Sequence, residues 1–103
     1  MELVDFVYNL IKRFPKSENS ILIPQILRAV NSAPANVAEG SYRRSKKEFV
    51  QFLYVAKGSV SEMLTLIEIS NRRKYITQEE RDKIRILCKD IFNLLSALIK
   101  SLS

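Results

Sequence analysis

Hydrophobic side chains recur at helical spacing from the first residues of the chain. The segment from about Glu2 to Phe14 carries apolar residues three or four positions apart, which indicates one face of an amphipathic helix and not a strand. These positions are Leu3, Val7, Leu10 and Phe14, flanked by Val4 and Ile11. Pro15 is expected to end this helix because a proline disfavours helical backbone at the residue before it.

A second helix is predicted from about Pro24 to Glu39. Pro24 suits a first helical turn, where no backbone N–H is needed. Pro34 falls inside the same segment, and a proline in a helix interior normally kinks or breaks it, so we expect a bend between Asn31 and Ala33. Gly40 follows in the position of a left-handed C-terminal cap. The apolar face of this helix comprises Leu27, Val30, Pro34, Val37 and Ala38.

Two capping boxes mark the starts of a third and a fourth helix. In Ser45-Lys-Lys-Glu48 and in Thr77-Gln-Glu-Glu80, the hydroxyl can accept from a backbone N–H of the first turn while the glutamate reaches back. The third helix is predicted to reach about Asn71, and Gly58 within it implies a close contact with a neighbouring helix. Its apolar stripe is formed by Phe49, Phe52, Leu53, Ala56, Val60, Met63, Leu64 and Ile67. The stripe of the fourth helix repeats like a heptad seam and is formed by Ile84, Leu87, Cys88, Ile91, Leu94, Leu95, Leu98 and Leu102.

Four amphipathic helices joined by short turns predict an all-α, antiparallel, up-down four-helix bundle. With 103 residues and no linker, low-complexity run or internal repeat, the chain is expected to form one domain over residues 1–103. Several apolar residues lie outside the main stripes, which suggests a subunit interface; the alternative is a broad core stripe. They are Val50, Tyr54, Ile69, Ile86, Phe92 and Ile99.

The composition argues against catalysis. The chain contains no histidine and a single cysteine, Cys88, which excludes Ser-His and Cys-His nucleophile pairs, two-histidine metal sites and an internal disulfide. We therefore expect a non-enzymatic protein with no metal and no cofactor, and a buried thiol at Cys88. Charges interrupt every apolar stretch and no basic region precedes one at the start, so we predict no signal peptide, no membrane span and a cytoplasmic location.

Four polar residues admit two interpretations. Asn36 and Glu39 are three residues apart and share a helix face, and Arg28 lies about two turns earlier on that face. Glu62 of the third helix is expected to point toward them. These residues could form a carboxylate site. Without histidine or a third convergent acid, we favour a structural hydrogen-bonded network that stabilises the proline bend or a subunit contact.

The net charge is +6, and many of the basic residues lie in three groups along the chain. The first group lies at a helix N-terminus, where anions are favoured, and is a candidate phosphate site formed by Arg43, Arg44, Lys46 and Lys47. The second group lies at a helix C-terminus, where the helix dipole already favours cations, and is formed by Arg72, Arg73 and Lys74. The third group is predicted to form a stripe on the outer face of the fourth helix and comprises Arg81, Arg85 and Lys89. Each group could bind nucleic acid, with Tyr42 and Tyr54 adding stacking surface near the first, or could be solvated surface only.

The centre of the chain carries a specific combination of motifs. Residues 34–40 read Pro-Ala-Asn-Val-Ala-Glu-Gly, a basic Arg-Arg-Ser follows, and residues 49–59 contain Phe-x-x-Phe-Leu-x-x-Ala-x-Gly-Ser. This combination resembles the small bacterial four helix bundle protein family, also called intervening-sequence proteins because some members are encoded inside insertions in large-subunit ribosomal RNA genes. The family is related to Avd, the accessory variability determinant of diversity-generating retroelements. The matching positions are Pro34, Asn36, Val37, Ala38, Glu39, Gly40, Arg44, Ser45, Phe49, Phe52, Leu53, Ala56, Gly58 and Ser59.

The resemblance implies an antiparallel four-helix bundle that assembles as a homopentameric barrel without known enzymatic activity. For Avd-like relatives it implies binding to a reverse transcriptase and, through a basic surface, to nucleic acid. Five copies of a +6 protomer would carry about +30, a charge that attracts polyanions. The chain departs from the family in its short first helix, which lacks the tryptophan-containing start of many members, and in Ala33, which replaces the usual isoleucine before Pro34.

Two functions from different classes follow from these observations. We expect a basic, oligomeric accessory protein that binds nucleic acid, in particular structured RNA, as an Avd-like partner of a reverse transcriptase in a diversity-generating retroelement. The alternative is a structural or protein-interaction module of the intervening-sequence type that does not bind nucleic acid directly.

Overall fold

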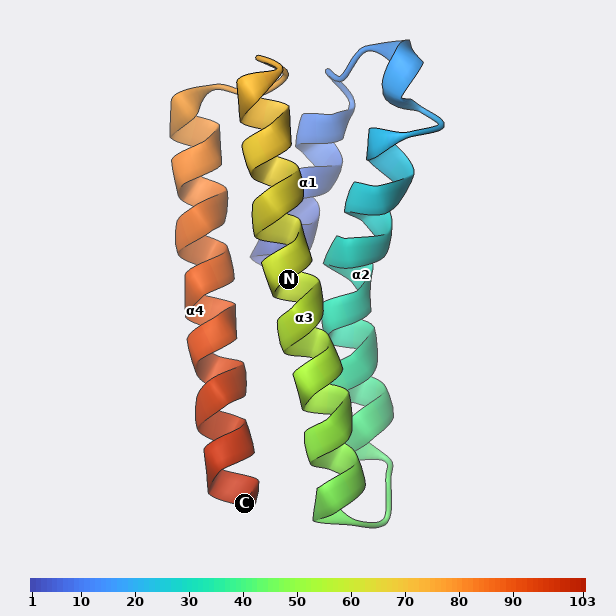
Figure 1. Cartoon of the computed structure of the whole chain (residues 1–103), viewed down its shortest axis with the longest axis vertical. Helices are drawn as coiled ribbons and strands as arrows, with labels where there is room; N and C mark the ends of the chain where they lie inside the picture. The colour runs from blue at the N-terminus through green and yellow to red at the C-terminus, as the bar shows by residue number, and fades with distance from the viewer.

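The computed structural model describes residues 1–103 as a bundle of four α-helices and one short 3-10 helix, with no strand (Figure 1). The elements are α1 (Glu2–Ile11), η1 (Lys16–Glu18), α2 (Leu22–Ser41), α3 (Lys46–Arg72) and α4 (Gln78–Leu102). Consecutive helices run in opposite directions, so the predicted all-α, antiparallel, up-down four-helix bundle is confirmed. The bundle measures 44 × 25 × 18 Å, and its length matches the roughly 40 Å expected for a helix as long as α3.

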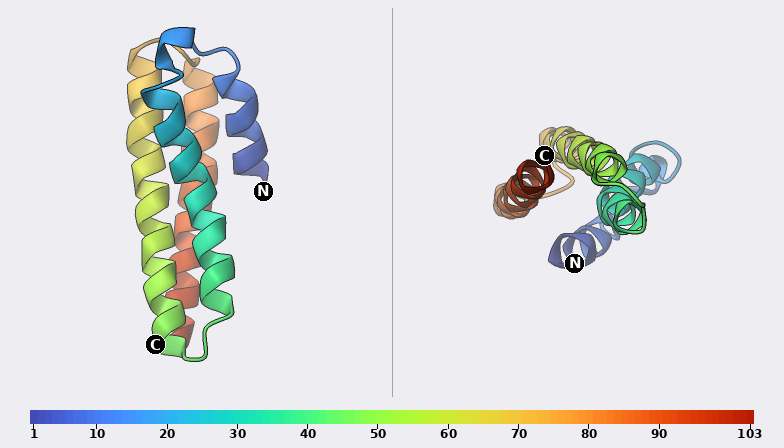
Figure 2. Two further views of the ribbon diagram at one scale, coloured as in Figure 1. Left: turned by 90° about the vertical axis from the view of Figure 1, so that its right-hand side faces the viewer. Right: turned by 90° about the horizontal axis from the view of Figure 1, so that it is seen from below.

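The helices occupy the corners of a square, with α1 diagonally opposite α3 (Figure 2). The long helices α2, α3 and α4 pack along their lengths, whereas α1 is short and covers only one half of the trough between α2 and α4. Below the start of α1 the trough remains open as an apolar groove of about 460 Å³, whose walls include Pro34, Val37, Leu94 and Leu95. None of the helices combines the length and apolar composition needed to span a membrane.

The starts of the two long C-terminal helices follow the predicted capping chemistry. At α4, the Glu80 N–H donates to the Thr77 hydroxyl at 3.1 Å and the Thr77 N–H donates to the Glu80 carboxylate at 2.9 Å, so the capping box is complete. At α3, the Glu48 N–H donates to the Ser45 hydroxyl at 3.1 Å, but the return bond from Glu48 is absent. The second predicted capping box is therefore half formed, and Ser45 acts as a simple N-cap.

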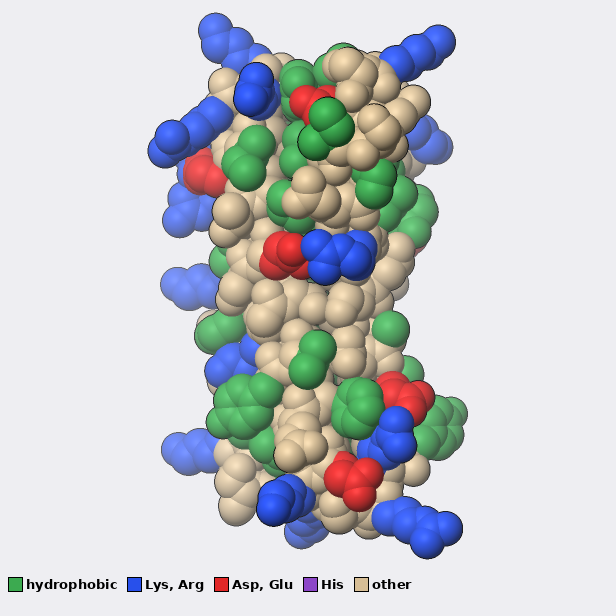
Figure 3. All heavy atoms as spheres, turned by 45° about the vertical axis from the view of Figure 1, so that its right-hand side comes forward, with side chains coloured by type: hydrophobic (Ala, Val, Ile, Leu, Met, Phe, Trp, Pro, Cys, Tyr) green, Lys and Arg blue, Asp and Glu red, His purple; other side chains and the backbone are tan.

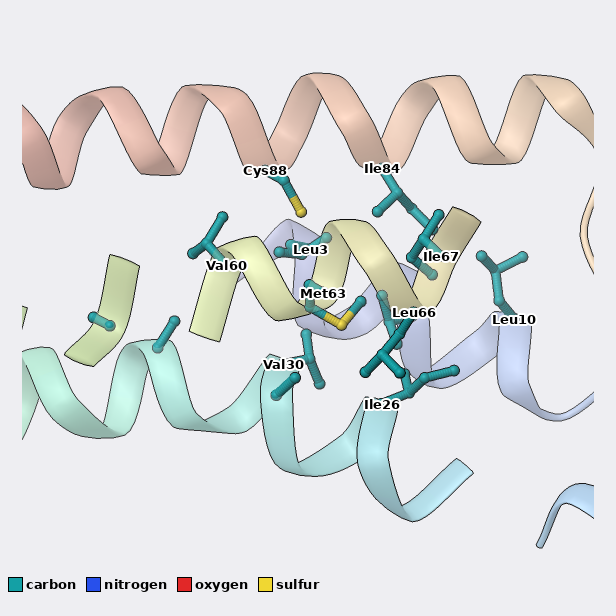
Figure 4. Packing of buried hydrophobic residues seen from close by; sticks show 14 of the residues in the cluster. Leu3, Leu10, Ile26, Val30, Val60, Met63, Leu66, Ile67, Ile84 and Cys88 are labelled. Atoms are coloured by element: carbon teal, nitrogen blue, oxygen red, sulfur yellow. The ribbon is translucent and has the colours of Figure 1, made fainter. Parts of the chain in front are cut away.

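The core is one apolar cluster drawn from all four helices (Figure 4). Helix α3 lies at its centre, with Leu53, Val60, Met63 and Ile67 fully buried against the other helices. Cys88 of α4 is also fully buried, as predicted, and burial raises the pKa of its thiol to about 11. The thiol is thus protonated and unreactive at neutral pH.

Helix α2 differs from its predicted boundaries. It begins two residues before Pro24 and runs without interruption through Pro34 to Ser41. Pro34 therefore does not break the helix, although it supplies no backbone N–H, and the bend expected near Asn31 to Ala33 stays a prediction. Helix α1 is likewise shorter than predicted and ends at Ile11, although Phe14 beyond it is buried and packs against the Tyr75 ring.

The two glycines have roles opposite to those predicted. Gly40 lies inside α2 with helical backbone, so the predicted left-handed cap is wrong; a Cβ at this position would lie 2.7 Å from Cβ of Phe52 and 2.8 Å from the Phe49 ring. Gly58 does not mark the close helix contact that its place in the sequence predicts, because a Cβ there would meet nothing within 4 Å. Gly40 is therefore the residue that lets α2 approach α3.

The residues predicted to lie outside the apolar stripes divide into two groups. Ile99 is buried in the core, and Val50 and Phe92 are half-buried, whereas Tyr54, Ile69 and Ile86 are exposed as expected for residues off the core stripe. Leu94 falls in the predicted seam of the fourth helix, but the residue is 70% exposed. Its side chain lines the open groove because α1 is too short to cover it.

Candidate nucleic-acid interface

The first basic group, Arg43, Arg44, Lys46 and Lys47, occupies the turn between α2 and α3 and the first residues of α3. All four residues are exposed at one end of the bundle. Arg43 is engaged within the molecule, because its guanidinium pairs with Glu39 and lies 4.8 Å from the centre of the Phe52 ring. Arg44, Lys46 and Lys47 have no acidic partner, so they are the part of this group that is free to meet a ligand.

The second basic group, Arg72, Arg73 and Lys74, ends α3 at the opposite end of the 44 Å bundle. All three residues are exposed and none takes part in an ion pair. Lys74 has a positive φ of 64°, the left-handed position that follows many helices, and the Tyr75 N–H closes the end by donating to the Ser70 carbonyl at 3.0 Å. A lysine therefore occupies this left-handed position, in which glycine is the usual residue.

The third group does not form the single outer stripe that its spacing predicted. Arg81 is largely buried at the contact of α3 and α4, where it pairs with Glu68 at 3.2 Å and Asp82 at 3.3 Å. The 3.3 Å contact with Asp82 is made by the buried Nε, and its geometry is not that of a hydrogen bond. Arg85 and Lys89 remain exposed, so only two of the three residues lie on the surface. Arg81 joins the two helices and is not available to a ligand.

Arg85 and Lys89 line a groove of about 670 Å³ between α3 and α4. The apolar part of its lining is formed by Leu64, Ile86 and Phe92. Side chains of α3 and α4 lie next to each other here because the two helices run antiparallel along their full lengths. The groove thus combines cations with aromatic and aliphatic surface.

Lys57 is a basic residue that the sequence pattern did not single out. Its ammonium lies 4.5 Å from the centre of the Phe92 ring and 5.6 Å from the centre of the Tyr54 ring, and it pairs with no carboxylate. In the sequence Lys57 has no other charged residue within four positions on either side, and its partner Phe92 lies on another helix. The i, i+3 spacing of Tyr54 and Lys57 is the only local signal for this contact.

The polar residues predicted to form one network separate into three sets. Arg28 of α2 pairs with Glu62 of α3 at 2.8 Å on the surface of the bundle, and Glu39 pairs with Arg43. Asn36 takes part in neither pair. The expectation that Glu62 points toward the second helix is confirmed by its pair with Arg28. The prediction of one shared network is wrong, because side chains on one helix face have different nearest partners on the adjacent helix and turn. These exposed pairs stabilise the fold by at most about 1 kcal/mol each.

The polar cluster beside Pro34 is built from Asn36 and two serines for which the sequence suggested no such role. The Asn36 amide donates to the carbonyl and the hydroxyl of Ser32, at 2.8 and 3.0 Å. The Ser32 hydroxyl lies 2.7 Å from the Ser59 hydroxyl of α3. Short side chains at this crossing let α2 and α3 lie close together, and the Ser32 and Ser59 hydroxyls are hydrogen-bonded to each other.

The charge of the surface is mostly uncompensated. Five of the 17 lysines and arginines, Arg13, Arg28, Arg43, Arg81 and Lys83, have a carboxylate within 4.0 Å. In the space-filling view, Lys and Arg side chains project from both ends of the molecule and along one edge (Figure 3). No group of three His, Cys, Asp or Glu side chains is placed to hold a metal ion. The surface is therefore suited to bind anions by charge.

Comparison with known proteins agrees with this architecture. Residues 1–97 match the family model described as 23S rRNA-intervening sequence protein. A crystal structure of a protein of unknown function from the S23 ribosomal protein family, from Bacteroides thetaiotaomicron VPI-5482, is similar with a TM-score of 0.84 and 28% sequence identity over 95% of this chain and 91% of that one. Among curated proteins none matches the chain significantly. The chain belongs to the 23S rRNA-intervening sequence protein family.

Proposed function

We propose that this protein is a non-enzymatic, self-associating accessory protein that binds structured RNA through its unpaired basic residues. The observation that carries the proposal is the uncompensated charge, since 12 of the 17 lysines and arginines lack an acidic partner. Cations without intramolecular partners release the counterions of a phosphate backbone when they bind it. The family is named after intervening sequences in 23S ribosomal RNA genes. RNA as the ligand is therefore proposed from the charge of the surface, not from the family name.

The proposed assembly is a homopentamer, as the family resemblance implies. The exposed apolar groove beside Leu94 offers a surface for self-association, because exposed apolar patches mark interaction sites. Five protomers would present each basic group five times and give a net charge of about +30. Such a ring binds a polyanion through many weak contacts at once.

A gel shift with a structured RNA at increasing salt tests the RNA-binding function. We expect binding at low salt that weakens steeply with salt, and an affinity at least about tenfold lower for the double variant Arg44→Glu/Lys47→Glu. The matched control is Lys12→Glu/Lys16→Glu, which makes the same charge change on exposed lysines away from the α2–α3 turn. Absence of any shift at low salt would refute RNA binding.

The proposed protein partner is a reverse transcriptase, as for Avd-like relatives. A reverse transcriptase gene and a template repeat beside the gene for this chain would support that partnership. Copurification of the polymerase that survives nuclease treatment would separate a direct protein contact from a shared RNA. A gene located inside a ribosomal RNA gene, with no polymerase nearby, would contradict it.

A second candidate function is a protein-interaction module that does not bind nucleic acid. The observation that favours it is the open apolar groove between α2 and α4, which is a surface for a protein and not for a phosphate backbone. Capture of one specific protein from nuclease-treated lysate, together with no RNA shift at low salt, would support this candidate over the first.

A further inference from the structure

We infer that the groove between α3 and α4 binds a single, unpaired nucleic-acid strand, and that Lys57 contacts the phosphate backbone of this strand. This inference rests on the proposed RNA-binding function and goes beyond it by naming the binding surface and the form of the ligand. The groove lining includes Leu64, Asp82, Arg85, Lys89 and Phe92. Lys57 and Tyr54 lie beside the lining residue Phe92, and the surface called here the α3–α4 groove includes both.

Lys57 is positioned to hold an anion. Its ammonium lies near the rings of both Phe92 and Tyr54, at 4.5 and 5.6 Å from their centres. Cation–π contacts with two rings restrict the flexible side chain before a ligand arrives, so less conformational entropy is lost on binding. No carboxylate neutralises this charge within the molecule. A phosphate oxygen supplies the missing partner.

The acidic side chains near the groove are already occupied. Asp82, which lines the groove, and Glu68 on α3 both pair with the largely buried Arg81. Each of the two carboxylates thus has a cation within 3.3 Å, although both side chains remain partly exposed. Arg85 and Lys89, one turn apart on α4, are left as unpaired cations along the groove wall. The groove is thus complementary in charge to a phosphodiester backbone.

Lys46 of the first basic group lies beyond the groove, on the same side of α3 as Lys57. Lys46 is 11 residues before Lys57, which corresponds to three helical turns, so the two lysines lie on the same face of α3, about 16 Å apart. The cations from Arg85 through Lys57 to Lys46 therefore follow one line along the bundle. A strand in the groove meets positive charge along that line.

The apolar lining indicates an unpaired strand and not a duplex. Phe92 is half-buried in the groove lining, and Tyr54, which is 57% exposed, lies beside it across Lys57. Aromatic rings stack on bases whose faces are free, and a duplex keeps those faces stacked inside. Cations beside stacking surface are the arrangement by which proteins bind single strands without sequence preference.

Fluorescence anisotropy with a labelled 12-nucleotide oligouridine tests the inference on the full-length protein. We expect Lys57→Gln to weaken binding about five- to tenfold and to lower the dependence on salt by about one phosphate contact. We expect Phe92→Leu, which keeps an apolar side chain, to weaken it by at least about fivefold through lost stacking. The control Lys12→Gln removes the same charge at the end of α1, across the bundle from α3, and should change the affinity less than about twofold.

Three outcomes would overturn the inference. Equal effects of Lys57→Gln and Lys12→Gln, with RNA still bound, would refute the groove and leave RNA binding intact. Tighter binding of a blunt duplex than of oligouridine or oligothymidine would refute the unpaired strand. No binding of any nucleic acid at low salt would refute the proposed function as well. Ultraviolet crosslinking of oligouridine to the unmodified protein, followed by peptide mapping, gives a readout independent of the variants; crosslinks in α3 and α4 support the groove.

Discussion

At the residue scale, a few side chains set where helices end and how closely they pack. Lys74 takes the left-handed position after α3, with φ of 64°, where a Cβ is disfavoured. Gly40 lies where a Cβ would collide with Phe52. Pro34 lies within α2 without interrupting it, although a proline in a helix interior often breaks the helix. The effect of each of these residues depends on the backbone conformation at its position and on the helix or turn beside it.

Replacing Lys74 by glycine is expected to stabilise the protein. A glycine at this position would adopt the left-handed backbone without strain, whereas an alanine keeps the strain and removes the same charge. We expect Lys74→Gly to exceed Lys74→Ala in free energy of unfolding by about 1 kcal/mol, measured by urea denaturation. Equal stability of the two variants would show that the turn carries no such strain.

At the element scale, the close approach of α2 to α3 depends on Gly40, and the start of α4 depends on Glu80. Glu80 closes the capping box with Thr77 and also pairs with Arg13, so one carboxylate ties α4 to the end of α1. The Arg81–Glu68 ion pair and the Ser32–Ser59 contact join α3 to its two neighbours. These contacts fix the register of the helices against one another.

The two glycines are expected to respond in opposite directions to alanine. Gly40→Ala places a Cβ 2.7 Å from Cβ of Phe52, which cannot move freely, and should cost about 1–3 kcal/mol of stability. Gly58→Ala meets open space within a helix and should add about 0.5–1 kcal/mol. Thermal unfolding of both variants beside the unmodified protein checks the prediction. Loss of stability in Gly58→Ala would contradict the open environment of that position.

Glu80 is expected to make stability depend on pH in the acid range. Partial burial alone would raise its pKa, but the Thr77 backbone N–H and Arg13 outweigh burial and lower it below the ordinary 4.5. A lowered pKa contributes stability that is present above about pH 4.5 and lost as pH falls through the folded-state value.

The variant Glu80→Gln tests this dependence. It should be less stable than the unmodified protein by about 0.5–1 kcal/mol at pH 7, and the difference should shrink toward pH 3. Denaturation curves at several pH values measure it. The control is Glu79→Gln, at an exposed first-turn glutamate without an ion pair, which should change little. A difference that stays constant down to pH 3 would contradict the assignment.

At the scale of the whole molecule, the short α1 leaves an apolar groove on one side, and the α3–α4 groove lies on another. Leu94 faces the first and Arg85 and Lys89 line the second, and the two grooves use different faces of α4. The bundle therefore separates an apolar surface suited to self-association from a basic surface suited to an anion. Helix α4 contributes to both grooves because its side chains project from different faces of the helix.

Charge at Leu94 is expected to disrupt self-association. Leu94 is 70% exposed in the single chain, so Leu94→Glu should leave the fold intact and yet reduce the native mass of the assembly. The matched control is Ile86→Glu, at a residue 62% exposed on another face of α4. Native mass spectrometry with circular dichroism checks both. Dissociation by Ile86→Glu alone would place the interface on the other face.

The sequence by itself determined the helices, their order and their class of fold. Helical periodicity and capping residues are local properties of the chain, which is why the four-helix bundle, the Thr77 cap and the buried Cys88 were predicted correctly. The three basic groups were also found from the sequence, because the residues of each group lie close together along the chain.

Only the tertiary structure decided which of these side chains are free. Arg81 turned inward to Glu68, Arg43 was taken up by Glu39, and Lys57 emerged as an unpaired cation held by the rings of two helices. It also decided that α2 and α3 approach closely at Gly40 and that Gly58 makes no close contact with another helix. The physical reason is that a helix period fixes the face on which a residue lies, while its partner, its burial and its freedom depend on the helix packed against that face.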